Sequence, residues 1–157
     1  MAVRGPQVTL DPEIIALTKD PRELDPPLLH WGLVIDWCVL EKLISERSLP
    51  FGDGLPIIHQ FERRFFVEQA VMEYLEDKCK FYIRLQIPLV ATGDRWLIEL
   101  DDTRRLRYTR MKPASWEKRA RPALKILRRE LGLDPKTEAM WWWSAQCNER
   151  YVLPPSA

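Results

Sequence analysis

The chain has 157 residues, of which 46% are hydrophobic, and a chain of this length can bury a core within one domain. This composition excludes intrinsic disorder, and three cysteines without a CxxC pair exclude a disulfide scaffold and argue against a zinc site. The longest charge-free stretches, residues 26–35 and 139–148, are too short for a transmembrane helix, and no secretory signal is apparent. We expect a single cytoplasmic domain over residues 1–157.

Four Asp-Pro pairs predict helix starts, because Asp can cap the first turn and Pro at the first helical position has no amide to leave unpaired. These pairs are Asp11-Pro12, Asp20-Pro21, Asp25-Pro26 and Asp134-Pro135. We expect a short helix over residues 12–18, about one turn after Pro21, and a long helix over residues 27–47. After a loop at residues 48–55, a second long helix is expected over residues 56–78.

The pattern then changes to β-branched and aromatic alternation, which predicts a small antiparallel meander. Its first strand covers residues 81–91, and Pro88 places that strand at an edge or a bulge. A turn at residues 92–94 leads to a return strand over residues 95–101. A third strand is expected over residues 106–111.

Two C-terminal helices complete the predicted order, one from Ser115 and one after Asp134, with Gly132 suited to the left-handed position between them. Pro122 should kink or restart the first of these helices. The predicted fold class is therefore α+β, with two long packed helices, a three-stranded antiparallel meander and two C-terminal helices. The segments are a helical part (residues 11–79), a β-meander (81–111), a basic and Trp-rich helical part (114–149) and a short tail (150–157).

One acid lies in an apolar stripe of each long predicted helix, Asp36 in the first and Glu68 in the second. A carboxylate in a dry interior needs a partner, so each is expected to form an ion pair, for which Arg63 and Arg64 are available. The alternative is that the two acids face a cleft and hold a metal for phosphodiester hydrolysis, as in a metal-dependent nuclease.

No complete catalytic, metal or cofactor motif is present in the sequence. Asp94 and Glu99 lie where hairpin nucleases carry an acid followed by Glu-x-Lys, but Asp101 occupies the position of the lysine. His30 and His59, the only histidines, are expected to be satisfied surface or core side chains. The sequence therefore predicts no catalytic residue, no metal ligand and no cofactor.

The near-neutral total charge of +1 conceals a strongly basic segment. Residues 104–129 carry a net charge of +10, which leaves −9 for the rest of the chain. The basic residues of this segment are Arg104, Arg105, Arg107, Arg110, Lys112, Lys118, Arg119, Arg121, Lys125, Arg128 and Arg129. Such a separation of charge bears on partners rather than on fold.

This segment combines the residue types that nucleic-acid binding uses, cations for phosphates and the aromatic rings of Tyr108 and Trp116 for stacking. The leading prediction is a non-enzymatic accessory protein that binds DNA or RNA with little sequence preference, as a subunit of a nucleoprotein complex. An acidic protein subunit, or solvent alone, is the alternative partner for the same face.

Three consecutive tryptophans follow at positions 141–143, and on a helix they fan through about 200°, so one core face cannot take all three. Trp141 or Trp142 is then a candidate partner-interface residue, or the helix is enclosed between layers of one domain. The second functional hypothesis is accordingly a protein-protein assembly or adaptor module that docks through this helix.

Overall fold

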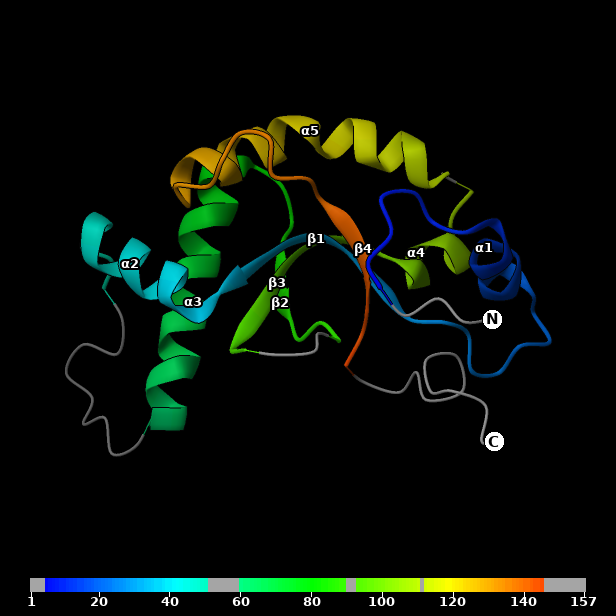
Figure 1. Ribbon diagram of the computed structural model, residues 1–157, viewed down its shortest axis with the longest axis horizontal. Helices are drawn as coiled ribbons and strands as arrows, with labels where there is room; N and C mark the ends of the chain where they lie inside the picture. The colour runs from blue at the N-terminus through cyan, green and yellow to red at the C-terminus, as the bar shows by residue number, and fades with distance from the viewer. Residues whose placement is uncertain (1–4, 51–59, 90–92, 111, 146–157) are drawn as a thin grey trace.

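The computed structural model describes residues 5–50, 60–89, 93–110 and 112–145. Within these ranges the chain forms five helices and one four-stranded antiparallel sheet, which confirms the α+β class (Figure 1). The strands are β1 (Leu29–Asp36), β2 (Arg84–Gln86), β3 (Arg95–Asp102) and β4 (Met140–Trp143), in the spatial order β2-β3-β1-β4. The helices are α1 (Pro12–Lys19), α2 (Trp37–Arg47), α3 (Gln60–Cys79), α4 (Thr103–Tyr108) and α5 (Pro113–Glu130).

The predicted long helix over residues 27–47 is wrong in its first half, where the chain forms β1. This strand pairs with β3 on one side and β4 on the other, so it is the centre of the sheet and its first five residues are all buried. A strand buried on both faces loses the polar alternation that identifies strands in a sequence. Only the second half of the predicted helix is helical, as α2.

Several expected elements are confirmed with adjusted bounds. Asp11 caps α1 by accepting a hydrogen bond from the amide of Glu13 at 2.8 Å, as the Asp-Pro pattern predicts. β3 matches the return strand, and α5 runs through Pro122 as one helix rather than restarting there. The first meander strand is shorter than expected, with three residues in β2. The expected start of the second long helix lies partly outside the described residues, and α3 forms from Gln60.

Two other predicted elements are wrong in type. The expected third strand is the short helix α4, which starts because the Asp102 side chain accepts a hydrogen bond from the amide of Arg105. The tryptophan run is the strand β4 rather than a helix, and the turn after Asp134 does not extend into one. Alternation along a strand turns Trp141 and Trp143 to one face and Trp142 to the other, which is how the sheet accommodates three large rings in sequence.

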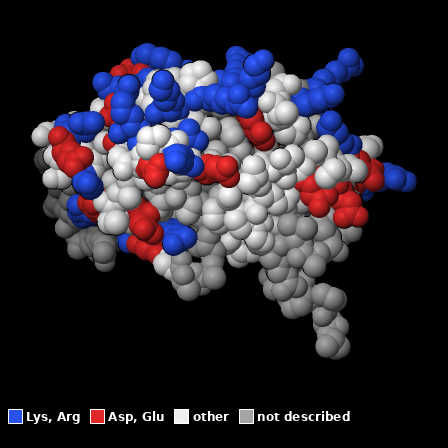
Figure 2. All heavy atoms as spheres, turned by 45° about the horizontal axis from the view of Figure 1, so that its top comes forward, with Lys and Arg blue, Asp and Glu red and all other residues white. Residues whose placement is uncertain are grey.

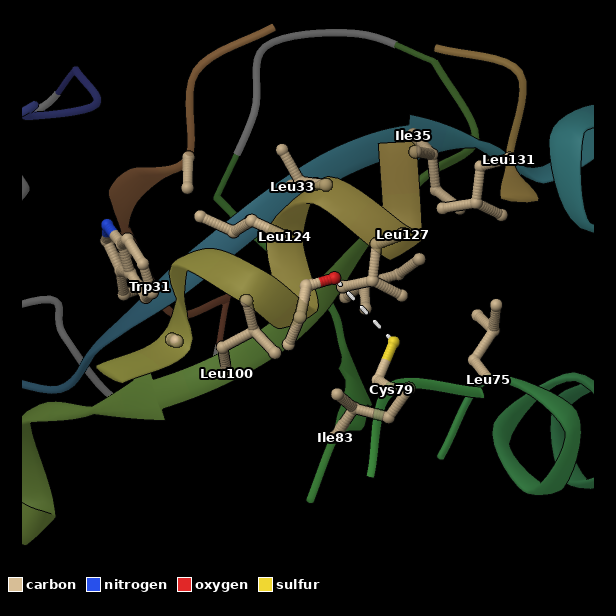
Figure 3. Close-up of a cluster of buried hydrophobic side chains, with 14 of the residues drawn as sticks. Trp31, Leu33, Ile35, Leu75, Cys79, Ile83, Leu100, Leu124, Leu127 and Leu131 are labelled. Carbon is tan, nitrogen blue, oxygen red and sulfur yellow. Dashed lines mark hydrogen bonds between the residues drawn. The ribbon is translucent and has the colours of Figure 1, made fainter. Parts of the chain in front are cut away.

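The main core lies between one face of the sheet and the helices α3 and α5 (Figure 3). Trp31, Leu33 and Ile35 from β1 face Leu124 and Leu127 of α5 there. The helix α5 crosses above the sheet in Figure 1, with its buried positions spaced three and four residues apart. None of the helices in the described part of the chain is both long and apolar enough to span a bilayer.

The two edges of the sheet come together beyond β2 and β4. The amide of Leu89 donates to the carbonyl of Trp143 at 2.7 Å, and the amide of Ala145 donates to the carbonyl of Ile87 at 3.0 Å. Pro88 forms an isolated bridge with Ser144 between these two bonds. Pro88 therefore lies just past the end of the edge strand β2, in keeping with the expected edge position.

The register between β1 and β3 shifts at Gly32. Trp31 pairs with Asp101 and Gly32 pairs with Glu99, so Leu100 is an extra residue on β3 and forms a β-bulge. The backbones approach so closely here that a Cβ on Gly32 would lie 1.9 Å from the carbonyl oxygen of Ile98. Only glycine fits this position of the central strand.

Replacing Gly32 with alanine should therefore destabilise the protein, because the added methyl group meets backbone atoms that cannot rotate away. We expect Gly32→Ala to lower the free energy of unfolding by about 2 kcal/mol or more, measured by urea denaturation. Gly5→Ala is the matched control, since a Cβ there meets nothing within 4 Å. Equal stability of the two variants would show that the close approach is not as described.

Candidate nucleic-acid interface

The outer face of α5 is the most basic surface that the predicted segment forms. Residues Ala120, Ala123, Leu124 and Leu127 turn one side of the helix into the core. The opposite side exposes Lys118, Arg119, Arg121, Lys125 and Arg129, which we call the α5 basic ridge. Figure 2 shows Lys and Arg side chains gathered along the upper part of the molecule, where α5 lies in Figure 1.

Three members of the ridge, Lys118, Arg121 and Lys125, lie on one line because they are spaced three and four residues apart. In the part of the chain that the structure describes, these three side chains make no ion pair, hydrogen bond or ring contact. The line from Lys118 to Lys125 spans about 10 Å at 1.5 Å per residue. Arg110 and Lys112 are also exposed, just before the start of α5. These cations are available to an external anion.

Other arginines of the basic segment are held by the protein itself. Arg104 pairs with Asp102 at 2.8 Å, and Arg105 donates two 2.6 Å hydrogen bonds to the buried carboxylate of Asp101. Arg107 donates to the carbonyl of Glu23, and Arg128 donates to the carbonyl of Thr137. These are the arginines nearest the sheet and at the C-terminal turn of α5. The predicted phosphate-contacting set therefore divides into arginines that have partners within the protein and exposed cations on and just before α5.

Arg107 lies on the helix α4 rather than on the expected third strand, and Arg105 lies on the same helix. Burial raises the pKa of Asp101 to about 6, against the opposing effect of the Arg105 guanidinium. The Arg105–Asp101 pair thus joins the first turns of α4 to the end of β3. Its role in the structure is to stabilise this connection.

The two predicted stacking rings differ in their surroundings. Trp116 is half-buried, its indole Nε1 donates to the carbonyl of Leu100 at 2.8 Å, and Arg105 and Arg119 lie against its ring at 4.5 and 5.5 Å from Cζ to the ring centroid. Arginine side chains already occupy positions near this ring. Tyr108 is 81% exposed at the end of α4 and is the better candidate for stacking with a base.

The tryptophan strand does not present the expected interface. Trp141 is 0% exposed, and its indole Nε1 donates to the Glu117 carboxylate on α5 at 3.0 Å. Trp143 is also buried, whereas Trp142 on the other face is half-buried. Trp141 consequently ties the strand β4 to α5 and is not available to a partner. Of the two predicted interface residues, only Trp142 retains a partly exposed surface.

The two acids singled out from the sequence do not form a common site. Asp36 ends β1 with its side chain 62% exposed and 3.5 Å from Arg95. Glu68 lies on α3, where burial raises its pKa. No contact between the two carboxylates is present among the described residues. Arg63 pairs with Glu41 and Arg64 pairs with Asp94. The charge of Arg64 also acts on Glu68, where it lowers the pKa of the carboxyl against the larger effect of burial.

A third group of side chains, which the sequence analysis did not identify, meets at the sheet. His30 is 2% exposed, and its Nδ1 lies 2.8 Å from Oε1 of the buried Glu99. The carboxylate of Asp102 lies within 4.8 Å of both ligand atoms. His30 is thus a core histidine with a partner, as expected. The sequence contains no signal for its neighbours, because 69 residues separate it from Glu99.

No protein-family model, curated protein or solved structure matches this chain. Its function must therefore be argued from its own residues.

The internal role of Arg105 leads to a stability prediction. Lysine keeps the charge but cannot donate two parallel hydrogen bonds to Asp101, and it stacks less well on Trp116. We expect Arg105→Lys to lower the free energy of unfolding by about 1–3 kcal/mol in urea denaturation. Arg121→Lys, on the exposed ridge, should change it by less than about 0.5 kcal/mol. If both variants match the wild-type protein, the pair is not structural.

Proposed function

We propose that the protein binds nucleic acid through the α5 basic ridge, as an accessory subunit without sequence-specific readout. The single observation that supports this proposal most is that Lys118, Arg121 and Lys125 of the ridge make no ion pair, hydrogen bond or ring contact within the described chain. An exposed helix needs few charges for solubility. Five cations on one face, close to two more before the helix, produce a strong local positive potential.

Phosphate is the ligand chemistry that best suits this ridge. Release of condensed counterions favours the binding of an extended cation array to a nucleic-acid backbone. The ridge carries no Asn or Gln that would hydrogen-bond a base edge, which favours sequence-tolerant binding. Tyr108, on the neighbouring α4, adds an exposed ring for single-stranded nucleic acid.

A salt titration tests the proposal directly. Binding of the protein to single- and double-stranded DNA and RNA is measured by fluorescence anisotropy between about 50 and 200 mM salt. The affinity should fall linearly on a log-log plot, with a slope near −0.9 for each phosphate contacted on duplex DNA. No binding to any of these nucleic acids at the lowest salt would overturn the proposal.

Charge reversal on the ridge provides the matched comparison. Lys118→Glu/Lys125→Glu should weaken binding about tenfold or more and reduce the magnitude of the slope by about 2. Lys19→Glu/Lys136→Glu changes the total charge equally at exposed positions outside α5 and should have a much smaller effect. Polyglutamate added as a competitor distinguishes the alternative partner. If it displaces the nucleic acid at equal charge concentration, an acidic protein is the better ligand.

A further inference from the structure

A histidine and two carboxylates meet on the sheet face that points away from α5. His30 alternates along β1 with the core residues Leu29 and Trp31, so its side chain lies on the opposite face of the sheet. The ligand atoms of His30, Glu99 and Asp102 all lie within 4.8 Å of one another. We propose that these three side chains bind one divalent first-row transition-metal ion such as Mn²⁺. This binding is independent of nucleic-acid binding.

The β-bulge is what brings the three side chains to one face. His30 pairs directly with Asp102, and Gly32 pairs with Glu99, so all four residues belong to the same side of the sheet. Glu99 and Asp102 are three residues apart and would point to opposite faces of a regular strand. The extra residue Leu100 reverses that alternation. A feature that interrupts the central pairing of the sheet thus assembles the cluster.

The spacing of the ligand atoms suits a metal ion. Nitrogen and carboxylate ligands bind first-row divalent metals at about 2.0–2.2 Å, which places adjacent ligands about 3 Å apart and opposite ligands about 4.3 Å apart. His30 Nδ1 and Glu99 Oε1 are 2.8 Å apart, and no pair of ligand atoms exceeds 4.8 Å. These separations lie close to that range.

The existing partners of the carboxylates orient them for this role. Gln86 Nε2 donates to Glu99 Oε2 at 3.0 Å, leaving Oε1 directed at His30. Asp102 accepts from Arg104 through Oδ2. A carboxylate offers about four lone-pair positions, so each can keep its partner and still bind a cation. Such neighbouring hydrogen bonds are typical supports of metal ligands.

The donor set selects the class of cation. Two carboxylates, one of them paired with Arg104, offer oxygen ligands, and one imidazole adds a nitrogen ligand that Mg²⁺ and Ca²⁺ do not prefer. No thiolate takes part, which disfavours Cu(I). A mixed imidazole and carboxylate set therefore favours Mn²⁺ and its first-row neighbours.

A cavity of about 360 Å³ lies beside the two carboxylates of the cluster, and His30 is not among its lining residues. Glu99 and Asp102 line this cavity together with Arg84, Arg104 and Tyr82. Water molecules entering there can complete the coordination of the cation, since three protein ligands leave positions open.

Electron paramagnetic resonance of free Mn²⁺ tests the proposal with the full-length protein at neutral pH. Titrating Mn²⁺ into the protein should remove the free-ion signal with a stoichiometry of one ion per chain. Excess Mg²⁺ should compete poorly. The proposal is overturned if Mn²⁺ does not bind at a ratio of 1:1 at concentrations up to about 1 mM, because a dissociation constant above that value means negligible affinity.

Two matched pairs of variants place the ion in the cluster. Asp102→Asn keeps a residue that can cap α4, and Asp11→Asn makes the same change at the cap of α1. His30→Gln removes the proposed nitrogen ligand, and His59→Gln changes the other histidine of the chain. Mn²⁺ affinity should fall about tenfold or more in Asp102→Asn and His30→Gln but remain unchanged in the controls.

Far-UV circular dichroism confirms that each variant is folded. If His30→Gln does not fold, the conservative Asp102→Asn variant decides the result. Equal Mn²⁺ affinity of Asp102→Asn and Asp11→Asn contradicts the site, whatever the salt dependence of nucleic-acid binding proves to be.

Discussion

The close contact between the backbones of β1 and β3 at Gly32 is the constraint on which the rest of the structure depends. It fixes the register of the central pair of strands and forces one extra residue into β3. Past the bulge, the end of β3 is displaced so that Asp101 turns to Arg105 and Asp102 caps α4. The start of α4, and the pairing of Arg104 and Arg105 with the acids at the end of β3, therefore follow from the absence of a side chain at position 32.

Local sequence patterns predict an element correctly when one of its faces is buried and the other is exposed. The apolar stripe of α5 and the Asp-Pro cap of α1 are read correctly because each helix has one buried and one exposed face. The failure at β1 has the opposite cause, since a central strand has two buried faces and no alternation. The apolar stripe predicted around Asp36 results from the same error. A helix would place Leu29 and Leu33 beside Asp36, because they precede it by seven and three residues, but both lie on the strand β1.

The candidate sites also differ in whether local sequence predicts them. The clustering of Lys and Arg in the sequence indicates the basic segment, and helical spacing then identifies which of its cations lie on the outer face of α5. The sequence could not show that Arg104 and Arg105 neutralise acids at the end of β3, because those acids become neighbours only through the bulge. The cluster of His30, Glu99 and Asp102 required strand order, register and bulge together. None of these three is encoded within a short stretch of sequence.

The hydrogen bonds from the amide of Leu89 to Trp143 and from the amide of Ala145 to Ile87 have a wider consequence for the sheet. They bring main-chain groups just past the edge strands β2 and β4 into contact with one another, so these groups do not remain free. One face of the sheet packs against the helices, and the other carries His30, Leu97 and Glu99, all of which are buried. Pairing between the two edges limits edge-to-edge association with other chains. Burial also places the contact between His30 and Glu99 in a medium of low dielectric constant, where polar contacts are stronger than in water.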